Sequence, residues 1–451
     1  MFQLVKEKSF YSTLVKIAVP VTLQSMISFA VNMLDTVMVG SLGDVILSAT
    51  SLGNQVSIYM MNIINGLAMG ASMLISQYWG KNDIPRIKTI FGIGMKSSLI
   101  ISILVTLLIQ LIPTTMMGIF TNDSAIIAEG VKYLSIISWS FVIMCISQTL
   151  ISMLRCVEVV RIGLVVSIVA FFTNVGLNYV LIFGKLGLPA MGISGAAMAT
   201  LISRIVECVI VLVYIIFIDK KLKLKFKDLW HNDWQLWKDY FKHGLPIASG
   251  NILWGLVGVF KAAIIGRLTA AAISANSITE VVLSLVTTIS SGLSSASLVI
   301  IGKTVGAKEY DKTRHYAKTL QLIFFCFGFI AAIGVLLVRG PIIALYDVTP
   351  EAKQLAMEFL VYGAITIWAT CYAATCFVGI NRGSGDANFV VAVDMICGWL
   401  IVLPLMFLAL KLGLPAPIVF LFSRIDQILK VFIAFVRLNL TDRWIVNVTR
   451  D

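Results

Sequence analysis

Apolar stretches long enough to cross a lipid bilayer recur along almost the whole chain. Of the 451 residues, 59% are hydrophobic and 13% are charged, whereas an average soluble domain is about half apolar and a quarter charged. A spanning helix needs about 20 residues. The sequence therefore predicts an all-α integral membrane protein with twelve transmembrane helices, at 13–40, 47–78, 89–112, 125–154, 162–184, 191–217, 244–266, 272–302, 319–339, 353–380, 388–410 and 416–437.

Basic residues are distributed unevenly between the two ends of these spans. If the N-terminus is cytoplasmic, the inner segments hold 24 Lys and Arg and the outer ones hold six. Lys and Arg accumulate in the cytoplasmic loops of membrane proteins. We therefore expect a multi-pass protein of the cell membrane with both termini in the cytoplasm. The formal net charge of +12 then indicates no nucleic-acid partner.

The second half of the chain repeats the first at an offset of 226 residues. Six spans return the chain to its starting side, so the halves share one orientation and are related by an axis along the membrane normal. We expect two six-helix bundles, 1–217 and 244–451, around a central cleft. The residues that align at this offset are Pro20 with Pro246, Gly40 with Gly266, Gly66 with Gly292, Gly80 with Gly306, and Lys185–Pro189 with Lys411–Pro415.

The segment that joins the halves, 218–243, is the largest basic loop. It carries Trp230, Trp234, Trp237 and Phe241 at helical spacing among Lys and Asp residues. This pattern is typical of an amphipathic helix that lies on the membrane surface. We therefore expect a cytoplasmic linker that is anchored to the lipid bilayer.

The first span contains one acidic residue, Asp35. Counting back from it, Asn32, Ser28 and Gln24 follow at intervals of three and four residues, which places the four polar groups on one helix face. A charge inside a spanning helix costs several kcal/mol and usually faces a cavity or a partner. This face therefore predicts a site that opens to water. The alternative is that Asp35 holds neighbouring helices together through hydrogen bonds.

A base replaces this acid at the equivalent position of the second half. The offset aligns Asp35 with Lys261, and Trp254 and the glycines at 250 and 258 replace the polar stripe. Lys261 is therefore a candidate partner of Asp35 across the cleft, or a group that attracts anions. Either role fails if Lys261 extends outward to the membrane surface.

Further polar side chains lie within other spans. Asn174 and Asn178 share a face of the fifth span, and Glu280 lies in the eighth. Thr200 lies in the sixth span, followed by Arg204 and Glu207. Arg204 recurs as Arg424 in the last span, within the same Ser-Arg-Ile sequence, and we interpret that pair as structural.

Enzymatic machinery is not indicated by any motif. The seven cysteines and three histidines show no zinc spacing, and Gly383-Ser384-Gly385-Asp386 lacks the Lys-Ser/Thr of a phosphate loop. We therefore expect neither an enzyme nor a metal or organic cofactor, and no use of ATP.

Several ordered motifs make the chain similar to the multidrug and toxic compound extrusion (MATE) family. They are Pro20 with Asn32–Gly40, Gly66 to Gly80, Asn174–Phe183 with Gly192–Ala197, and the Arg-Gly-x-Gly-Asp turn at Arg382–Asp386. The resemblance covers nearly the whole chain and is closer to the bacterial branch with an acidic first span. It implies antiport by alternating access, in which a proton or sodium gradient drives the export of small, amphipathic and often cationic compounds.

The resemblance also implies roles for individual residues. Asp35 is expected to be the coupling carboxylate, with the neighbouring side chains Gln148, Asn174, Asn178 and Thr200. Sodium at Asp35 is the alternative to a proton, and Asn178 stands where an acid is often found, which weakens a sodium site. Gln24, Ser28, Asn32, Trp254, Lys261 and Glu280 are expected to line the substrate cleft.

One rival function remains open at this point. A flippase of lipids or lipid-linked saccharides from the same wider superfamily would use Lys261 and the cleft glycines for a phosphate-bearing head group. A long basic groove and more than twelve spans would favour the flippase, and the sequence indicates neither. We expect a monomer in the bilayer with a small-molecule substrate.

Overall fold

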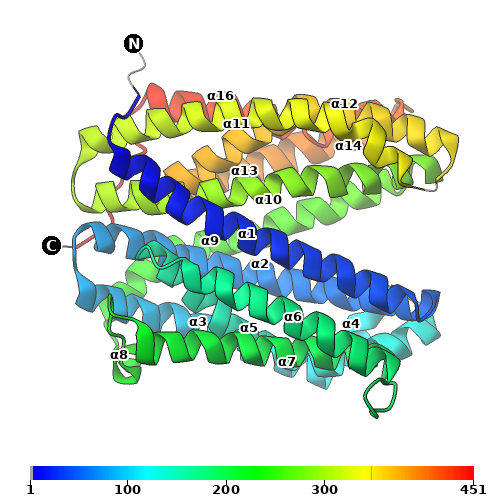
Figure 1. The fold of residues 1–451 in the computed structure, drawn as a ribbon. Coiled ribbons are helices and arrows are strands. Elements are labelled where there is room, and N and C mark those ends of the chain that lie inside the picture. The colour runs from blue at the N-terminus through cyan, green and yellow to red at the C-terminus, as the bar shows by residue number, and fades with distance from the viewer. Residues whose placement is uncertain (1–3, 347, 451) are drawn as a thin grey trace. The chain divides into compact units, whose positions relative to one another are not determined.

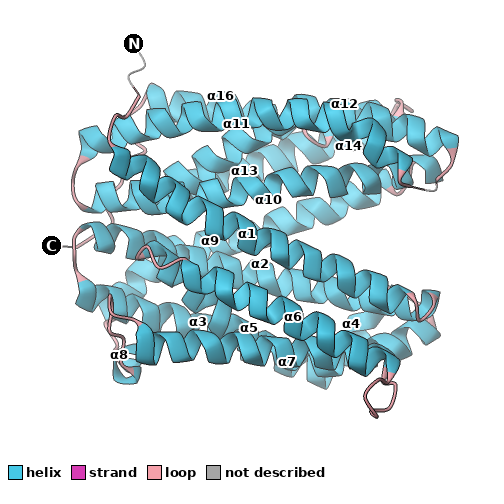
Figure 2. Ribbon diagram, viewed as in Figure 1, coloured by secondary structure: helices cyan, strands magenta, loops and turns pink. Residues whose placement is uncertain are grey.

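The computed structural model describes residues 4–346 and 348–450, and every regular element within these ranges is a helix (Figure 1; Figure 2). The predicted all-α membrane protein is confirmed. The helices are α1 (Lys8–Gly40), α2 (Asp44–Gly80), α3 (Ile84–Leu111), α4 (Pro113–Gly118), α5 (Ser124–Cys156), α6 (Arg161–Phe183), α7 (Gly192–Val213), α8 (Phe226–Trp230), α9 (Trp234–Ile265), α10 (Ala270–Gly306), α11 (Tyr310–Ala344), α12 (Pro350–Ala374), α13 (Ala387–Met395), α14 (Leu403–Lys411), α15 (Ala416–Phe422) and α16 (Ile425–Asn439).

Helix ends coincide with capping residues in the sequence. The side chains of Asp123, Thr269 and Thr349 accept hydrogen bonds from backbone amides in the first turns of α5, α10 and α12, which satisfies donors that a helix start leaves unpaired. Gly184 ends α6 with a φ of 64°, a left-handed conformation that glycine adopts without steric cost.

Eleven helical runs within the described residues are long and apolar enough to cross a membrane. They correspond to the first eleven predicted spans, with π-helical turns continuing α7 and α12 and joining α13 to α14. The twelfth predicted span, 416–437, forms two shorter helices, α15 and α16, which meet at Ser423 and Arg424. The last span is therefore present but broken near its middle.

The chain packs into two units, and three of the four boundaries along the sequence fall inside helices. The N-terminal unit comprises Leu23–Ile75 and Asn82–Ala248. The C-terminal unit comprises the described residues up to Thr22, Ser76–Lys81, and those from Ser249 onward. The first part of α1 thus belongs to the C-terminal unit, and the first part of α9 belongs to the N-terminal unit. Two of the four changes of unit, those after Thr22 and after Ala248, lie 226 residues apart, which is the offset of the sequence repeat.

Repeat-related glycines explain how these exchanged segments pack. In the N-terminal unit, a Cβ on Gly66 of α2 would lie 2.6 Å from the Cα of Ala248 in α9. In the C-terminal unit, a Cβ on Gly292 of α10 would lie 2.5 Å from the carbonyl oxygen of Ala18 in α1. Real Cβ atoms do not approach that closely, so each contact requires glycine. The repeat of Gly66 as Gly292 therefore preserves one helix crossing in each unit.

The joining segment 218–243 lies within the N-terminal unit and is not one continuous helix. It contains α8 and the first turns of α9. Lys88 of α3 binds the carboxylate of Asp228 at 2.8 Å, and this hydrogen bond holds the pKa of Asp228 below its ordinary value. Trp230 and Trp234 are 62% and 71% exposed. Both rings are therefore accessible for the contact with the membrane surface that the sequence predicts.

Candidate functional site

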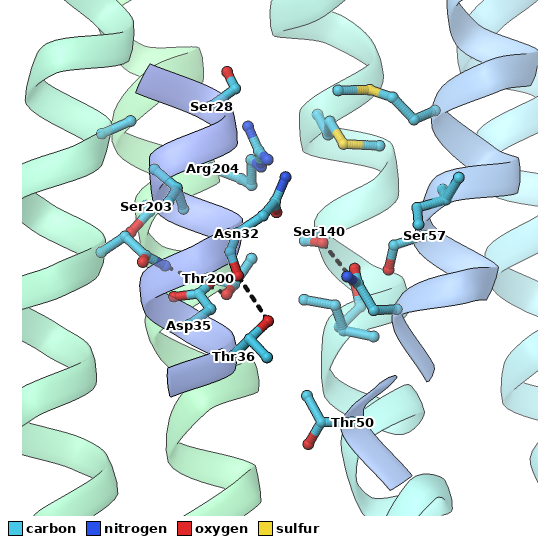
Figure 3. Close-up of a pocket in the computed structure, with 18 of the residues that line it drawn as sticks. Ser28, Asn32, Asp35, Thr36, Thr50, Ser57, Ser140, Thr200, Ser203 and Arg204 are labelled. Carbon is cyan, nitrogen blue, oxygen red and sulfur yellow. Dashed lines mark hydrogen bonds between the residues drawn. The ribbon is translucent and has the colours of Figure 1, made fainter. Parts of the chain in front are cut away.

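Three of the four polar side chains predicted on one face of the first span line a single cavity. Ser28, Asn32 and Asp35 of α1 border a cavity of about 260 Å³ in the N-terminal unit (Figure 3). Gln24 is the exception. It is 8% exposed and lies outside the lining, where its Oε1 accepts a long hydrogen bond from Arg155 at 3.5 Å. Ser28, Asn32 and Asp35 therefore share one cavity wall, whereas Gln24 lies in the protein interior.

Other helices of the N-terminal unit complete the wall. α7 packs on both α5 and α6 (Figure 1), so side chains from these helices converge on α1. Apolar surface comes from residues such as Met61, Phe141 and Met144. The other polar lining residues are Thr36 of α1, Thr50, Ser51, Asn54 and Ser57 of α2, Tyr133, Ser140 and Gln148 of α5, Ser167 and Asn174 of α6, and Thr200, Ser203, Arg204 and Glu207 of α7.

A chain of hydrogen bonds begins at Asp35. Asn178 Nδ2 donates to Asp35 Oδ1 and also to Asn174 Oδ1 at 3.1 Å, and Asn174 Nδ2 donates to Thr200 Oγ1 at 3.4 Å. Asn178 is only 1% exposed, and its own Oδ1 has no hydrogen-bond partner among residues 4–346 and 348–450. Four residues of the predicted coupling group are thus assembled around one carboxylate.

Gln148, the fifth member of the predicted coupling group, has a different partner. Its Nε2 donates to Glu207 Oε1 at 2.6 Å, and Glu207 Oε2 is 2.8 Å from Arg204 Nη1. Asp35, Glu207 and Arg204 are the charged groups among the described residues that line the cavity. Two acids and one base leave the cavity with a charge of −1 when all three are ionised. Such a cavity attracts a cation, and its charge changes when a carboxylate binds a proton.

Trp254, Lys261 and Glu280 belong to the C-terminal unit. Lys261 Nζ donates to the backbone carbonyl of Ser423 at 2.6 Å and lies 5.4 Å from the centre of the Trp254 ring. Glu280 pairs with Arg424 at 3.0 Å. A Cβ on Gly258, one turn before Lys261, would meet no atom within 4 Å. An aromatic wall and open space thus lie beside Lys261.

A second buried cation shares the Trp254 ring. Lys430 Nζ lies 4.0 Å from the ring centre and binds Asp394 at 2.8 Å and Asp426 at 3.1 Å. Lys430 therefore has carboxylate partners, whereas the hydrogen bond of Lys261 goes to an uncharged carbonyl.

Arg204, Glu207, Tyr133 and the polar residues of α2 were absent from the predicted site. The signal for Arg204 and Glu207 was their charge inside an apolar helix, which marks functional candidates. The signal for α2 was the helical spacing of Thr50, Asn54 and Ser57. Neither signal tells how deep a side chain lies or which helix faces it.

The comparison with known proteins gives two matches to one family. The sequence profile described as MatE matches residues 20–180 and again residues 246–408. The two matches begin 226 residues apart, as the internal repeat does.

Curated relatives cover most of the chain at modest identity. The probable multidrug resistance protein NorM of Halalkalibacterium halodurans is 25% identical over 394 residues, which are 86% of this chain and 85% of that protein. The multidrug resistance protein MdtK of Yersinia pseudotuberculosis is 22% identical and covers 87% of this chain and 86% of its own.

Solved structures share the fold. The Vibrio cholerae MATE transporter VcmN in its bent form matches with a TM-score of 0.86 at 18% identity, over 96% of this chain and 97% of its own. A transporter of the MOP superfamily from Pyrococcus furiosus matches with a TM-score of 0.87 at 16% identity, over 97% and 98%. With the profile matches spanning well over half of the sequence, the chain belongs to the MatE family of multi-pass membrane transporters.

Proposed function

We propose that the chain is a secondary active antiporter that exports small amphipathic organic cations in exchange for protons by alternating access. The observation that carries this proposal is the position of Asp35. Its carboxylate borders a cavity with a charge of −1 and is held by Asn178. The names of the relatives, which are multidrug resistance proteins, support this substrate class over a flippase.

Competition for one carboxylate is sufficient for coupling. When Asp35 is ionised, the cavity carries one negative charge and attracts an organic cation. When Asp35 is protonated, that attraction is lost and the cation is released. A proton and a substrate that exclude each other in this way must move in opposite directions during a transport cycle.

The neighbours of Asp35 have separate roles in this proposal. Asn178 orients the carboxylate, and Asn174 and Thr200 hold Asn178 in place through the hydrogen-bond chain. Ser28 and Asn32 contact the substrate from the same face of α1, and Met61, Phe141 and Met144 offer it apolar surface. Methionine adapts to ligands of different shape.

A further substrate contact is proposed in the C-terminal unit. Trp254 offers an aromatic face, and Lys261 can bind an anionic group of a zwitterionic substrate. Glu280 is 52% exposed at its side chain and remains accessible beside Arg424. This contact is subordinate to the coupling role of Asp35.

The residues around Asp35 fit a proton better than sodium. Sodium needs several oxygen ligands, whereas the amide N–H group of Asn178 points at the carboxylate. Asn178 Oδ1 would have to turn toward Asp35 to bind sodium with it.

Transport in proteoliposomes tests the proposal. Purified protein is reconstituted, and the flux of ethidium, a fluorescent organic cation, is followed under an imposed proton or sodium gradient. We expect the proton gradient to drive flux in the wild type and not in Asp35→Asn. Flux that ignores both gradients, or that persists in Asp35→Asn, would refute the proposal. Flux driven only by a sodium gradient would show that sodium, and not a proton, is the coupling ion.

The orientation is proposed from the positive-inside pattern. With 24 basic residues in the inner segments and six in the outer ones, both termini should lie in the cytoplasm of the cell membrane, where the protein works as a monomer. Cysteines placed at Lys227 and Lys185 should react with a membrane-impermeant maleimide from opposite sides. Labelling of both from the outside of intact cells would reject this orientation.

A further inference from the structure

Arg204 and Glu207 form an ion pair, and both residues line the cavity that contains Asp35. Figure 3 shows Arg204 near Asn32 and Asp35 in this cavity. The Glu207 side chain is 3% exposed and both of its oxygens are engaged, Oε2 by Arg204 at 2.8 Å and Oε1 by Gln148 at 2.6 Å. The Arg204 side chain is 28% exposed. The acid is therefore buried and fully bonded, while the base remains open to the cavity.

Helix stability alone does not account for this pair. Charged residues in a spanning segment are costly and usually serve transport. A buried ion pair is often no more stabilising than apolar residues of the same volume. The hydrogen bond of Gln148 adds a third polar side chain to the same apolar region, so the pair should have a role in what the cavity binds.

We propose that the Arg204–Glu207 pair sets the charge of the cavity and thereby makes it selective for organic cations with one positive charge. The inference rests on the proposed function, in which Asp35 alternates between a proton and the substrate. Because Arg204 cancels Glu207, Asp35 alone decides whether the cavity carries one negative charge or none. Arg204 and Glu207 act as specificity-determining residues at the binding site.

Changes in either partner would alter the match between cavity and substrate. Without Glu207, the charge of Arg204 cancels that of ionised Asp35, and the cavity is neutral in the state that should bind a cation. Without Arg204, the cavity carries two negative charges and suits a dication better. An unmatched charge in a site of low dielectric constant is strongly disfavoured.

The deciding experiment restores the wild-type charge of the cavity without restoring the Arg204–Glu207 ion pair. Ethidium binding to purified protein is measured by fluorescence for Glu207→Gln and for the double variant Arg204→Gln/Glu207→Gln. Glutamine keeps the size and an acceptor for Gln148. We expect Glu207→Gln to weaken ethidium binding at least about tenfold and the double variant to recover most of that loss. A double variant no better than Glu207→Gln would overturn the proposal.

A second arm tests the selectivity for one charge. Propidium has the ring system of ethidium and one additional positive charge. In Arg204→Gln, the affinity for propidium relative to ethidium should rise above the wild-type ratio. An unchanged ratio would contradict the proposed charge-setting role.

Two controls separate the possible failures. Ile205→Ala changes an exposed residue of α7 beside Arg204 and should bind ethidium like the wild type. Asp35→Asn tests the proposed function itself. If Asp35→Asn keeps full ethidium binding, the proposed function fails. If it loses binding while the double variant does not recover, only the inference about the pair fails.

Discussion

Asp35 depends on Asn178, whose amide N–H group holds the carboxylate at the cavity wall. We expect Asn178→Ala to lower proton-driven ethidium export roughly tenfold, because a hydrogen bond to a charged group contributes about 1.5–3 kcal/mol. Initial export rates in proteoliposomes at one fixed pH gradient measure this. The lower export rate should come from the lost orientation of the Asp35 carboxylate and not from unfolding of the variant.

A matched variant serves as the control for Asn178→Ala. Asn54 of α2 lines the same cavity but belongs to another helix and is not in the hydrogen-bond chain of Asp35. Asn54→Ala should retain most of the coupling to the proton gradient, even if its apparent affinity for ethidium changes. Equal loss of coupling in both variants would show that Asn178 has no special connection to Asp35.

Single residues of the site were only partly predictable from the sequence. Helical spacing was enough to group Ser28, Asn32 and Asp35, and all three line one cavity. The same spacing included Gln24, which is buried near Arg155 instead. Periodicity gives the face of a helix, but the depth of a side chain depends on the neighbouring helix, which one sequence does not identify.

Gly66 is the point where α2 and α9 cross in the N-terminal unit. A Cβ there would lie 2.6 Å from the Cα of Ala248, so Gly66→Leu should force the helices apart. Overpacking of this kind typically costs about 1–3 kcal/mol, and the midpoint of thermal unfolding in detergent should fall. Gly176→Leu is the control, since a Cβ at Gly176 would meet no atom within 4 Å. A similar midpoint for both variants would contradict the packing argument.

The contact between α8 and α3 should depend on the charge of Asp228. Lys88 keeps the pKa of Asp228 below its ordinary value of 3.8, so the contact is present above that pH and is lost as the pH falls through the lowered pKa. At neutral pH, Asp228→Asn should mimic the loss and speed hydrogen exchange in the loop before α9. Lys227→Gln serves as the control, and equal exchange in Asp228→Asn and wild type would refute the contact.

Spans were easier to predict than their packing. The apolar runs gave the first eleven spans, because hydrophobic length is a property of each segment alone. They did not reveal the break between α15 and α16, nor the change of unit within α1 and α9. Those features depend on contacts such as Gly66 with Ala248, which involve residues far apart in the sequence.

The segment after α16 stabilises the C-terminal unit as a whole. Trp444 is buried, Ser384 Oγ donates to its carbonyl at 2.7 Å, and Val446 N donates to the Ser384 carbonyl at 2.8 Å. Gln77 of α2 donates to the Val446 carbonyl and accepts from Val448 N at 2.8 Å. These bonds connect α2 and the Arg-Gly-x-Gly-Asp turn through one extended segment.

Deletion from Trp444 onward should therefore lower the thermal unfolding midpoint of the protein by several degrees. The deletion removes a buried aromatic side chain and leaves Gln77 and Ser384 without these partners. Thr449→Ala is the control, because the Thr449 hydroxyl donates its hydrogen bond to Asn447 in the same segment. Retention of the full midpoint after deletion would show that the segment is dispensable for stability.

The duplication was the most informative property of the whole sequence. Its offset recurs in the change of unit within α1 and α9 and in the two matches to the family profile. The duplication also showed that Asp35 has Lys261 as its counterpart, so the coupling role was expected in one half only. The repeat did not supply the network of Arg204, Glu207 and Gln148. The same offset aligns Glu207 with Ile433 and Gln148 with Ala374.

Coupling in this protein should come from competition between a proton and an organic cation for Asp35. The most direct measurement is proton release when ethidium binds to purified protein in weakly buffered solution, followed with a pH indicator across a series of starting pH values. We predict release in the pH range where Asp35 is partly protonated, and none from Asp35→Asn. Binding without proton release at every pH, or equal release from Asp35→Asn, would rule out competition at Asp35.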